Sequence, residues 1–262
     1  MIIDSHVHFG TTNKFNMPSE ILLESMKKYN IDYSIVSNVE ACEFSSELIP
    51  IPKSTPCLQL SANEKTLNLV KNHAYKLKGL FWICPNSESF DDNIGNFILE
   101  NSKHFVGIKM HPFHSNIAIS DLKCEEYLKF AQKHKIPFVV HTAADEKSHV
   151  RHVYLMAKKY PDIDFVMVHM GLGTNNLEAI EYISQLDNLY GDTTWVSLEN
   201  TLMAIKKCGS EKILFGTDSP IDGINTYDKY LELMEGLKKK LPKKDYENVM
   251  FRNAIKLFKL NL

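Results

Sequence analysis

Two histidines one residue apart, His6 and His8, lie at the end of the short apolar run that begins the chain. In an extended strand successive side chains alternate between faces, so these two point one way while Ile3, Ser5 and Val7 point the other. Neutral imidazole is a common ligand for zinc, iron and nickel, and two rings on one rigid strand lose little entropy when they bind an ion. The pair therefore predicts part of a metal site, provided that further ligand residues occur at equivalent places.

Such residues do recur along the chain. His111, His141 and His169 each follow a short apolar run, and Asp218 ends another one. Polar groups at the ends of buried strands are costly unless they find partners, and the strands of a barrel bring all their carboxyl ends to one mouth. We therefore expect these side chains to form one site. Lys109 shares a strand face with His111 and should look into the same space.

The elements that must position these residues follow an alternating pattern. Short β-branched or aromatic runs alternate with helical segments from end to end, which is typical of βα units. The predicted strands are residues 2–8, 33–38, 80–85, 105–111, 137–142, 164–169, 189–193 and 213–218. The predicted helices are residues 21–29, 65–77, 93–101, 122–134, 149–159, 177–186, 198–208, 227–241 and 246–260. Eight such units in 262 residues predict an α/β fold, a single-domain (β/α)8 TIM barrel over residues 1–262.

One predicted connection is longer than the others. It runs from Val39 to Asn63, between the second strand and its helix, and contains Pro50, Pro52 and Pro56. A proline-rich loop is stiff and extended, and a loop that follows a barrel strand lies on the face where sites are built. We interpret it as a wall or lid of the pocket, with an ordinary surface excursion as the alternative.

Composition limits the class of protein. Hydrophobic residues make up 44% of the chain, charged residues 24%, and the formal net charge is -2. These values are typical of a globular domain and show no electrostatic footprint for nucleic acid or an anionic membrane. No segment approaches the roughly 18 to 20 apolar residues of a membrane span. We therefore expect a soluble, cytoplasmic protein whose partner is a small molecule, with neither nucleic acid nor membrane as a partner.

The cysteines point to neither disulfides nor a thiolate metal site. There are five of them, widely spaced and without a Cys-x-x-Cys motif: Cys42, Cys57, Cys84, Cys124 and Cys208. An odd, dispersed set favours reduced and mostly buried thiols.

The whole constellation resembles the amidohydrolase superfamily, and within it the amidohydrolase-2 group of small-acid decarboxylases and hydrolases. The resemblance rests on motifs that cover the chain in order: Asp-Ser-His-Val-His-Phe at 4–9, Gly-Ile-Lys-Met-His-Pro at 107–112, His-Thr at 141–142, His-Met-Gly at 169–171, Phe-Gly-Thr-Asp-Ser-Pro at 215–220, and Asn-Ala-x-x-Leu-Phe at 253–258. It implies a metal-dependent TIM-barrel enzyme that binds one or two divalent ions, zinc first among them. It also allows a homo-oligomer.

The resemblance implies roles for individual residues. It makes His6, His8, His141 and Asp218 metal ligands, and His169 either a further ligand or an acid/base group. Lys109 has three readings: a carbamylated lysine that bridges two metals, an amine that pairs with a substrate carboxylate, or a structural ion pair. His111, two residues later, is expected to contact the substrate.

The expected chemistry is hydrolysis of an amide, cyclic amide or ester in a small polar molecule. A metal lowers the pKa of bound water from about 16 toward 7, and Asp218 can accept the proton and pass it to the leaving group. His169 and His111 would polarise the carbonyl or hold the oxyanion. Two alternatives stay open: a non-oxidative decarboxylase with the same ligands, and a catalytically silent barrel that binds a metal or small ligand.

Overall fold

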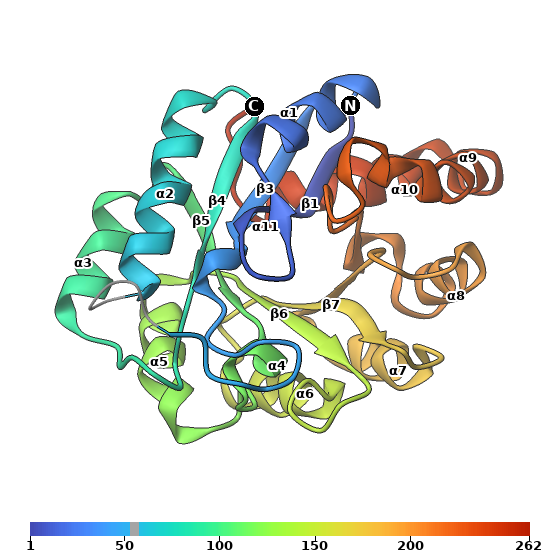
Figure 1. The fold of residues 1–262 in the computed structure, drawn as a ribbon. Helices are drawn as coiled ribbons and strands as arrows, with labels where there is room; N and C mark the ends of the chain where they lie inside the picture. Colours follow the sequence, from blue (N-terminus) through green and yellow to red (C-terminus); the bar gives the residue numbers. More distant parts are fainter. Residues whose placement is uncertain (53–57) are drawn as a thin grey trace.

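The fold is built around one curled sheet. The computed structural model describes residues 1–52 and 58–262, and within them the sheet has nine strands in the order β2-β1-β3-β4-β5-β6-β7-β8-β9 (Figure 1). The strands are β1 (Ile3–Thr11), β2 (Asn16–Met17), β3 (Tyr33–Asn38), β4 (Leu77–Trp82), β5 (Phe105–Met110), β6 (Phe138–Ala143), β7 (Phe165–Leu172), β8 (Leu189–Asp192) and β9 (Ile213–Leu214). From β1 and β3 onward every neighbouring pair is parallel, as sequential βα units require.

The two ends of the sheet approach each other. One edge of β1 pairs with β3, and the opposite edge meets the segment that follows β9 at Val7 and pairs antiparallel with β2 farther along the strand. Across the edge opposite β3 the backbone of Ser5 donates to Phe215 at 2.8 Å and that of His8 to Ser219 at 2.8 Å, and the backbone of Asp218 donates to His6 at 3.0 Å. These bonds bring the residues after β9 beside the paired histidines.

Helices surround the sheet (Figure 1). The α-helices are α1 (Ser19–Lys28), α2 (Leu58–Asn72), α3 (Asp92–Glu100), α4 (Pro112–Ser115), α5 (Glu125–His134), α6 (Val150–Lys159), α7 (Leu177–Gln185), α8 (Leu198–Cys208), α9 (Leu231–Lys240), α10 (Lys243–Glu247) and α11 (Asn253–Leu257). The described 3-10 helices are η1 (Val39–Ala41), η2 (Leu122–Cys124), η3 (Ser210–Lys212) and η4 (Gly223–Tyr230), and η5 (Asn248–Arg252) is a π-helix.

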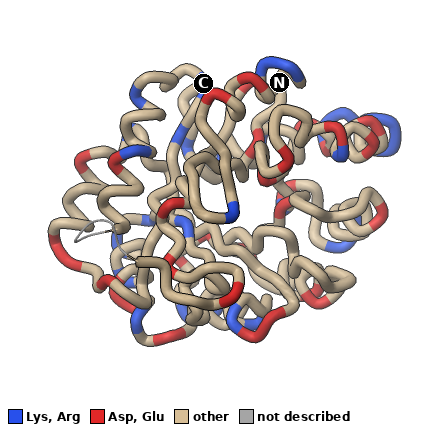
Figure 2. Tube along the Cα trace, in the orientation of Figure 1, with Lys and Arg blue, Asp and Glu red and all other residues tan. Residues whose placement is uncertain are grey.

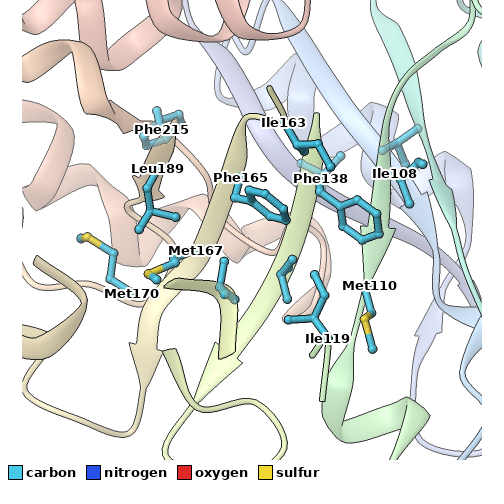
Figure 3. Close-up of a cluster of buried hydrophobic side chains, with 14 of the residues drawn as sticks. Ile108, Met110, Ile119, Phe138, Ile163, Phe165, Met167, Met170, Leu189 and Phe215 are labelled. Atoms are coloured by element: carbon cyan, nitrogen blue, oxygen red, sulfur yellow. The ribbon is translucent and has the colours of Figure 1, made fainter. Parts of the chain in front are cut away.

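The larger apolar cluster fills the space between the sheet and these helices (Figure 3). Alternate strand residues enter it, such as Phe138 with Val140 on β6 and Phe165 with Met167 on β7. Figure 3 shows Phe138 and Phe165 side by side on neighbouring strands. Because side chains alternate along a strand, the intervening residues must face the other side of the sheet.

A second apolar cluster lies on that other face. It contains Val139 and Val166, and Leu257 and Phe258 at the end of the chain pack against it. Ile3 also belongs to it, which corrects the expectation that Ile3 faces away from His6 and His8. The register of β1 against β3 shifts between Asp4 and Val7, and this irregularity breaks the strict alternation along the strand.

The predicted elements match the structure closely at several ends and differ at others. The strand at 33–38 and the helix at 198–208 have the predicted bounds, whereas β4 begins three residues before the predicted strand and β9 is only two residues long. Helix α2 begins at Leu58, before the predicted Lys65, so Asn63 lies inside it rather than in the preceding connection. Asn63 bonds the backbone of Trp82 on both sides, which fastens the helix to β4. Pro56 and Cys57 lie outside the described residues.

Charged residues are distributed over the outer helices and loops with both signs interspersed (Figure 2). Lys238, Lys239 and Lys240 form the exposed last turn of α9, where cations favour the helix dipole. Among the described residues no helix is both long and apolar enough to cross a membrane. The four described cysteines are free thiols, and three of them are buried.

Candidate metal centre

Asp218 stands at the centre of the predicted site residues. Its Oδ1 lies 3.3 Å from His6 Nδ1 and 3.4 Å from His8 Nε2, while its Oδ2 lies 3.9 Å from His169 Nε2. All four side chains are buried. The carboxylate therefore joins the histidine pair of β1 to the histidine of β7.

His141 and His111 extend this group on one side. His141 Nδ1 lies 3.0 Å from His169 Nε2, and the His141 and His111 rings stack with centroids 3.7 Å apart. The other face of His111 stacks on Trp82 at 5.9 Å. The two histidines thus connect to Asp218 through His169 rather than directly.

Lys109 lies beneath His6 and is completely buried. Its Nζ donates to His6 Nε2 at 2.8 Å and lies 5.7 Å from the centre of the Trp82 ring. A neutral His6 ring that accepts at Nε2 carries its proton on Nδ1, the atom that faces Asp218. No carboxylate of the described residues lies at ion-pair distance from Lys109, so the structural ion-pair reading has no partner there.

Strand alternation explains only some of these placements. Lys109 pairs with Val139 on the neighbouring strand, and His141 follows Val139 by two residues on β6. Both side chains therefore lie on the same face of the sheet as Val139 and face the site directly. His169 follows Val168, which faces the site side, so alternation would turn the imidazole away. His169 and Asp218 adopt left-handed backbone conformations with φ of 68° and 62°, which are uncommon among non-glycine residues and redirect both side chains.

Burial controls the protonation of the cluster. Burial lowers the pKa of all five site histidines: His6, His8, His111, His141 and His169. The charge of the neighbouring Lys109 lowers the pKa of His6 further. The imidazoles are therefore neutral and able to bind a metal.

The carboxylate and the amine behave differently. Burial alone would raise the pKa of Asp218, but the facing rings of His169 and His6 and a hydrogen bond from His8 hold it well below its usual range. Burial lowers the pKa of Lys109 to about 8. The site therefore holds an ionised acceptor beside an amine that loses its proton easily.

Sequence reasoning missed Asp192, at the end of β8. Its Oδ1 accepts from the backbone of His169 at 2.8 Å and of Thr194 at 3.1 Å, and its Oδ2 lies 3.4 Å from His6 Nδ1. The signal was present, because Asp192 is a polar residue at the end of an apolar strand, as Asp218 is. Asp192 therefore contacts two of the predicted site histidines, His6 through its ring and His169 through its backbone.

Two tryptophans, the only ones in the chain, were also missed. Trp82 packs between His8 and His111, and Trp195 donates its indole N–H to Asp218 Oδ2 at 2.8 Å. Neither has a spacing signal in the sequence, since nothing marks which aromatic side chain turns toward a strand end.

Asp4, the first residue of the β1 motif, has a supporting role. Its carboxylate accepts from Thr217 Oγ1, from Tyr227 Oη at 2.7 Å and from the backbone of His6 at 3.1 Å. Burial raises the pKa of Asp4 to about 7. These bonds tie β1 to the segment before Asp218 and so fix the distance between the histidine pair and the carboxylate.

The donor set fits a divalent metal. The side chains of His6, His169 and Asp218 offer ligand atoms that all lie within 4.8 Å of one another, and His8 adjoins them through Asp218. Imidazole nitrogens with a carboxylate oxygen are the ligands of zinc and of other first-row divalent ions. The geometry thus supports a divalent metal without selecting one.

A cavity of about 770 Å³ has His114 in its lining but none of the predicted site residues. Its walls come from residues 11–15 after β1 and from residues 40–52 after β3, and His114 contributes to it. The His114 ring lies 4.5 Å from that of His111. The long connection after β3 lines this cavity, which is within the size range of pockets for small ligands, and its role as a wall or lid of the metal site stays a prediction.

Comparison with known proteins gives a consistent result. A family model described as Amidohydrolase matches residues 3–260. No curated protein matches the sequence. Three solved structures illustrate the structural likeness, each aligned over nearly the whole of both chains.

The first is a 5-carboxyvanillate decarboxylase from Novosphingobium aromaticivorans DSM 12444 with bound manganese, at 12% identity, TM-score 0.77, and 99% and 97% coverage of this chain and that one. The second is a dihydroxybenzoic acid decarboxylase from Polaromonas sp. JS666 with bound manganese and the inhibitor 2-nitroresorcinol, at 16% identity, TM-score 0.73, and 100% and 97% coverage.

The third is an Acinetobacter baumannii protein named as a probable 2-pyrone-4,6-dicarboxylic acid hydrolase with citric acid bound, at 14% identity, TM-score 0.67, and 99% coverage of both chains. At these identities the likeness shows the fold. Both decarboxylases hold manganese, which agrees with a divalent-metal site in this chain.

Proposed function

This chain belongs to the amidohydrolase family, and from that premise we propose that it is a metal-dependent hydrolase of a small polar amide, cyclic amide or ester. The observation that carries the proposal is the position of Asp218, whose carboxylate lies between the His6 and His8 pair and His169. A base at that junction can reach both a water near the histidine pair and a substrate that enters from the other side.

We assign the metal to His6, His8, His141 and Asp218, with His169 beside them. A divalent ion, zinc or manganese, supplies Lewis acidity when bound and lowers the pKa of water to about 7. The His6 and His8 rings, neutral through burial, leave their lone pairs available for it.

Four side chains of the chain provide proton transfer and substrate binding. Asp218, ionised and facing both sides, accepts the proton of the attacking water and returns it to the leaving nitrogen or oxygen. His169 and His111 hydrogen-bond the substrate carbonyl as charge develops on its oxygen. Lys109, whose amine lies under His6, pairs with an acidic group of the substrate.

We propose that the chain forms one domain over residues 1–262, a closed (β/α)8 barrel. It is favoured by the eight parallel strands and by the backbone bonds from β1 to the segment after β9. In such a barrel the active site lies at the carboxyl ends of the strands, where all seven proposed residues are found.

Decarboxylation is the second candidate, favoured by a specific observation. Two full-length structural relatives with bound manganese are named as decarboxylases of hydroxylated aromatic acids. The same ligands would serve, and Lys109 would hold the substrate carboxylate before carbon dioxide leaves. Ligand identity fixes the metal, whereas the pocket loops fix the substrate, so the two reactions share this site.

The test is turnover by the metal-loaded protein on two panels, one of lactones, esters and cyclic amides and one of hydroxybenzoates followed by carbon dioxide release. Asp218→Asn should lower kcat by about 10² to 10⁴ on the active panel while metal is retained at saturating concentration. Turnover confined to the acid panel would replace hydrolysis by decarboxylation. A metal-loaded wild type that is inactive on both panels would favour the silent barrel.

A further inference from the structure

Trp195 occupies an unusual position beside the metal centre. It follows β8 and adopts φ of 59°, a left-handed conformation that is a genuine outlier for a bulky side chain. His169, within β7, and Asp218, in the segment after β9, share this conformation. The side chains of Trp195 and His169 both approach Oδ2 of Asp218, the third residue. Such backbone strain persists where the surrounding structure holds it in place.

The contact itself is a short hydrogen bond. Trp195 Nε1 donates to Asp218 Oδ2 at 2.8 Å, although the Trp195 residue is 44% exposed. An indole N–H can only donate, so it neither competes for a proton nor accepts one. The other oxygen of Asp218, Oδ1, faces His6 and His8 at 3.3 and 3.4 Å.

Neighbouring residues hold the indole in this orientation. Lys229 Nζ lies 3.3 Å from the centre of the Trp195 ring, and the Trp195 backbone N–H donates to Tyr230 Oη at 3.2 Å. Tyr230 Oη in turn donates to the carbonyl of Thr217 at 2.8 Å. Lys229 also pairs with Asp222. Trp195 and the residue before Asp218 are thus fixed to the same turn, η4.

We propose that Trp195 is a positioning residue that fixes the rotation of the Asp218 carboxylate, occupying Oδ2 so that Oδ1 stays turned toward His6 and His8. The inference rests on the proposed metal site and adds a residue that lies outside the ligand set. Without the N–H, Oδ2 loses its 2.8 Å donor, and only the longer contacts to the histidines then oppose rotation of the Asp218 carboxylate.

The test compares two substitutions at the same position. Trp195→Phe keeps an aromatic ring under Lys229 but lacks the N–H, whereas Trp195→Ala lacks both. The readouts are the Kd for Mn²⁺ by calorimetry and the visible absorption spectrum of the Co²⁺-loaded protein. We expect both variants to bind Mn²⁺ about 10- to 100-fold more weakly than the wild type, with altered Co²⁺ bands. Their urea unfolding midpoints without metal should match that of the wild type, since the side chain is partly exposed.

Each other outcome has a defined meaning. A Phe variant with wild-type affinity and spectrum, alongside an impaired Ala variant, would show a packing role and overturn the inference alone. Failure of the wild type to bind Mn²⁺ would overturn the proposed function and this inference with it.

A second measurement needs no variant. The chain has two tryptophans, so the ¹⁵N-labelled protein gives two indole N–H resonances, and that of Trp195 is identified by contacts to Lys229. We expect it to exchange slowly with solvent and to shift on addition of Zn²⁺. Rapid exchange and an unchanged shift at saturating Zn²⁺ would contradict a bond to Asp218.

Discussion

Lys109 Nζ lies 2.8 Å from His6 Nε2, so the buried amine and a predicted metal ligand share one hydrogen bond. A bound metal that takes this nitrogen must displace the lysine proton from it. The amine is then free to turn toward a substrate acid or to join a second ion. The role of Lys109 can therefore be read from metal stoichiometry before any substrate is known.

Lys109→Met should keep the wild-type number of metal ions per chain. Methionine fills much of the same buried volume, and under our proposal Lys109 binds substrate rather than metal. On an acidic substrate the variant should lose about 10- to 100-fold in kcat/KM, the value of one charge-assisted hydrogen bond. Elemental analysis provides the count. A fall from two ions to one would instead indicate a bridging lysine.

The double variant His6→Ala, His8→Ala should lose the metal but not the fold. Both substitutions leave every member of the two large apolar clusters in place, and these clusters hold the sheet and helices together. Metal content and far-UV circular dichroism at 25 °C test both halves of the prediction. His73→Ala, beyond the end of α2, is the matched control and should retain metal. A double variant that is unfolded at 25 °C would mean that these histidines are needed for folding.

The sequence was sufficient to predict residues whose placement follows from strand alternation. Lys109 and His141 face the site because they share the parity of buried neighbours, and the paired histidines of β1 face it together. His169 and Asp218 were predicted from position and resemblance. Their left-handed backbone, which brings them into the site, follows from tertiary contacts rather than from residue type.

The remaining differences also arise from tertiary structure. The apolar run at 213–218 predicts a full strand, but only Ile213–Leu214 forms the ladder with β8, because the next residues bond to the irregular edge of β1. Trp195 has no periodic signal at all. Asp192, in contrast, could have been predicted, since it ends a short apolar strand in the sequence as Asp218 does.

Asp192→Asn should weaken metal binding although Asp192 is not a proposed ligand. The carboxylate accepts from Thr194 Oγ1 at 3.0 Å and faces His6 Nδ1 at 3.4 Å with the same oxygen. An amide NH₂ at that place would oppose these donors. We expect about 10- to 100-fold weaker Mn²⁺ binding and a loss of about 1 to 3 kcal/mol in the free energy of unfolding. Asp187→Asn, exposed after α7, is the control; equal affinities for the two variants would contradict the support role.

Glu43 provides a pH prediction that is independent of the metal centre. Its side chain is 4% exposed, and Oε1 accepts from the backbone of Ser87 at 2.6 Å. Burial raises the pKa of Glu43 above its usual 4.5, so the folded protein binds this proton more tightly than the unfolded chain. The stabilising contribution of the carboxyl is therefore complete below pH 4.5 and is lost as pH rises through the raised pKa, by at most about 1.4 kcal/mol per pH unit.

Glu43→Gln removes this titration. Urea unfolding of the metal-free protein between pH 4.5 and 8 should show the wild type losing stability relative to Glu43→Gln as pH rises, and then a constant difference. Glu64→Gln, exposed on α2, should follow the wild type, and parallel curves for the wild type and Glu43→Gln would mean that Glu43 titrates as an ordinary carboxyl.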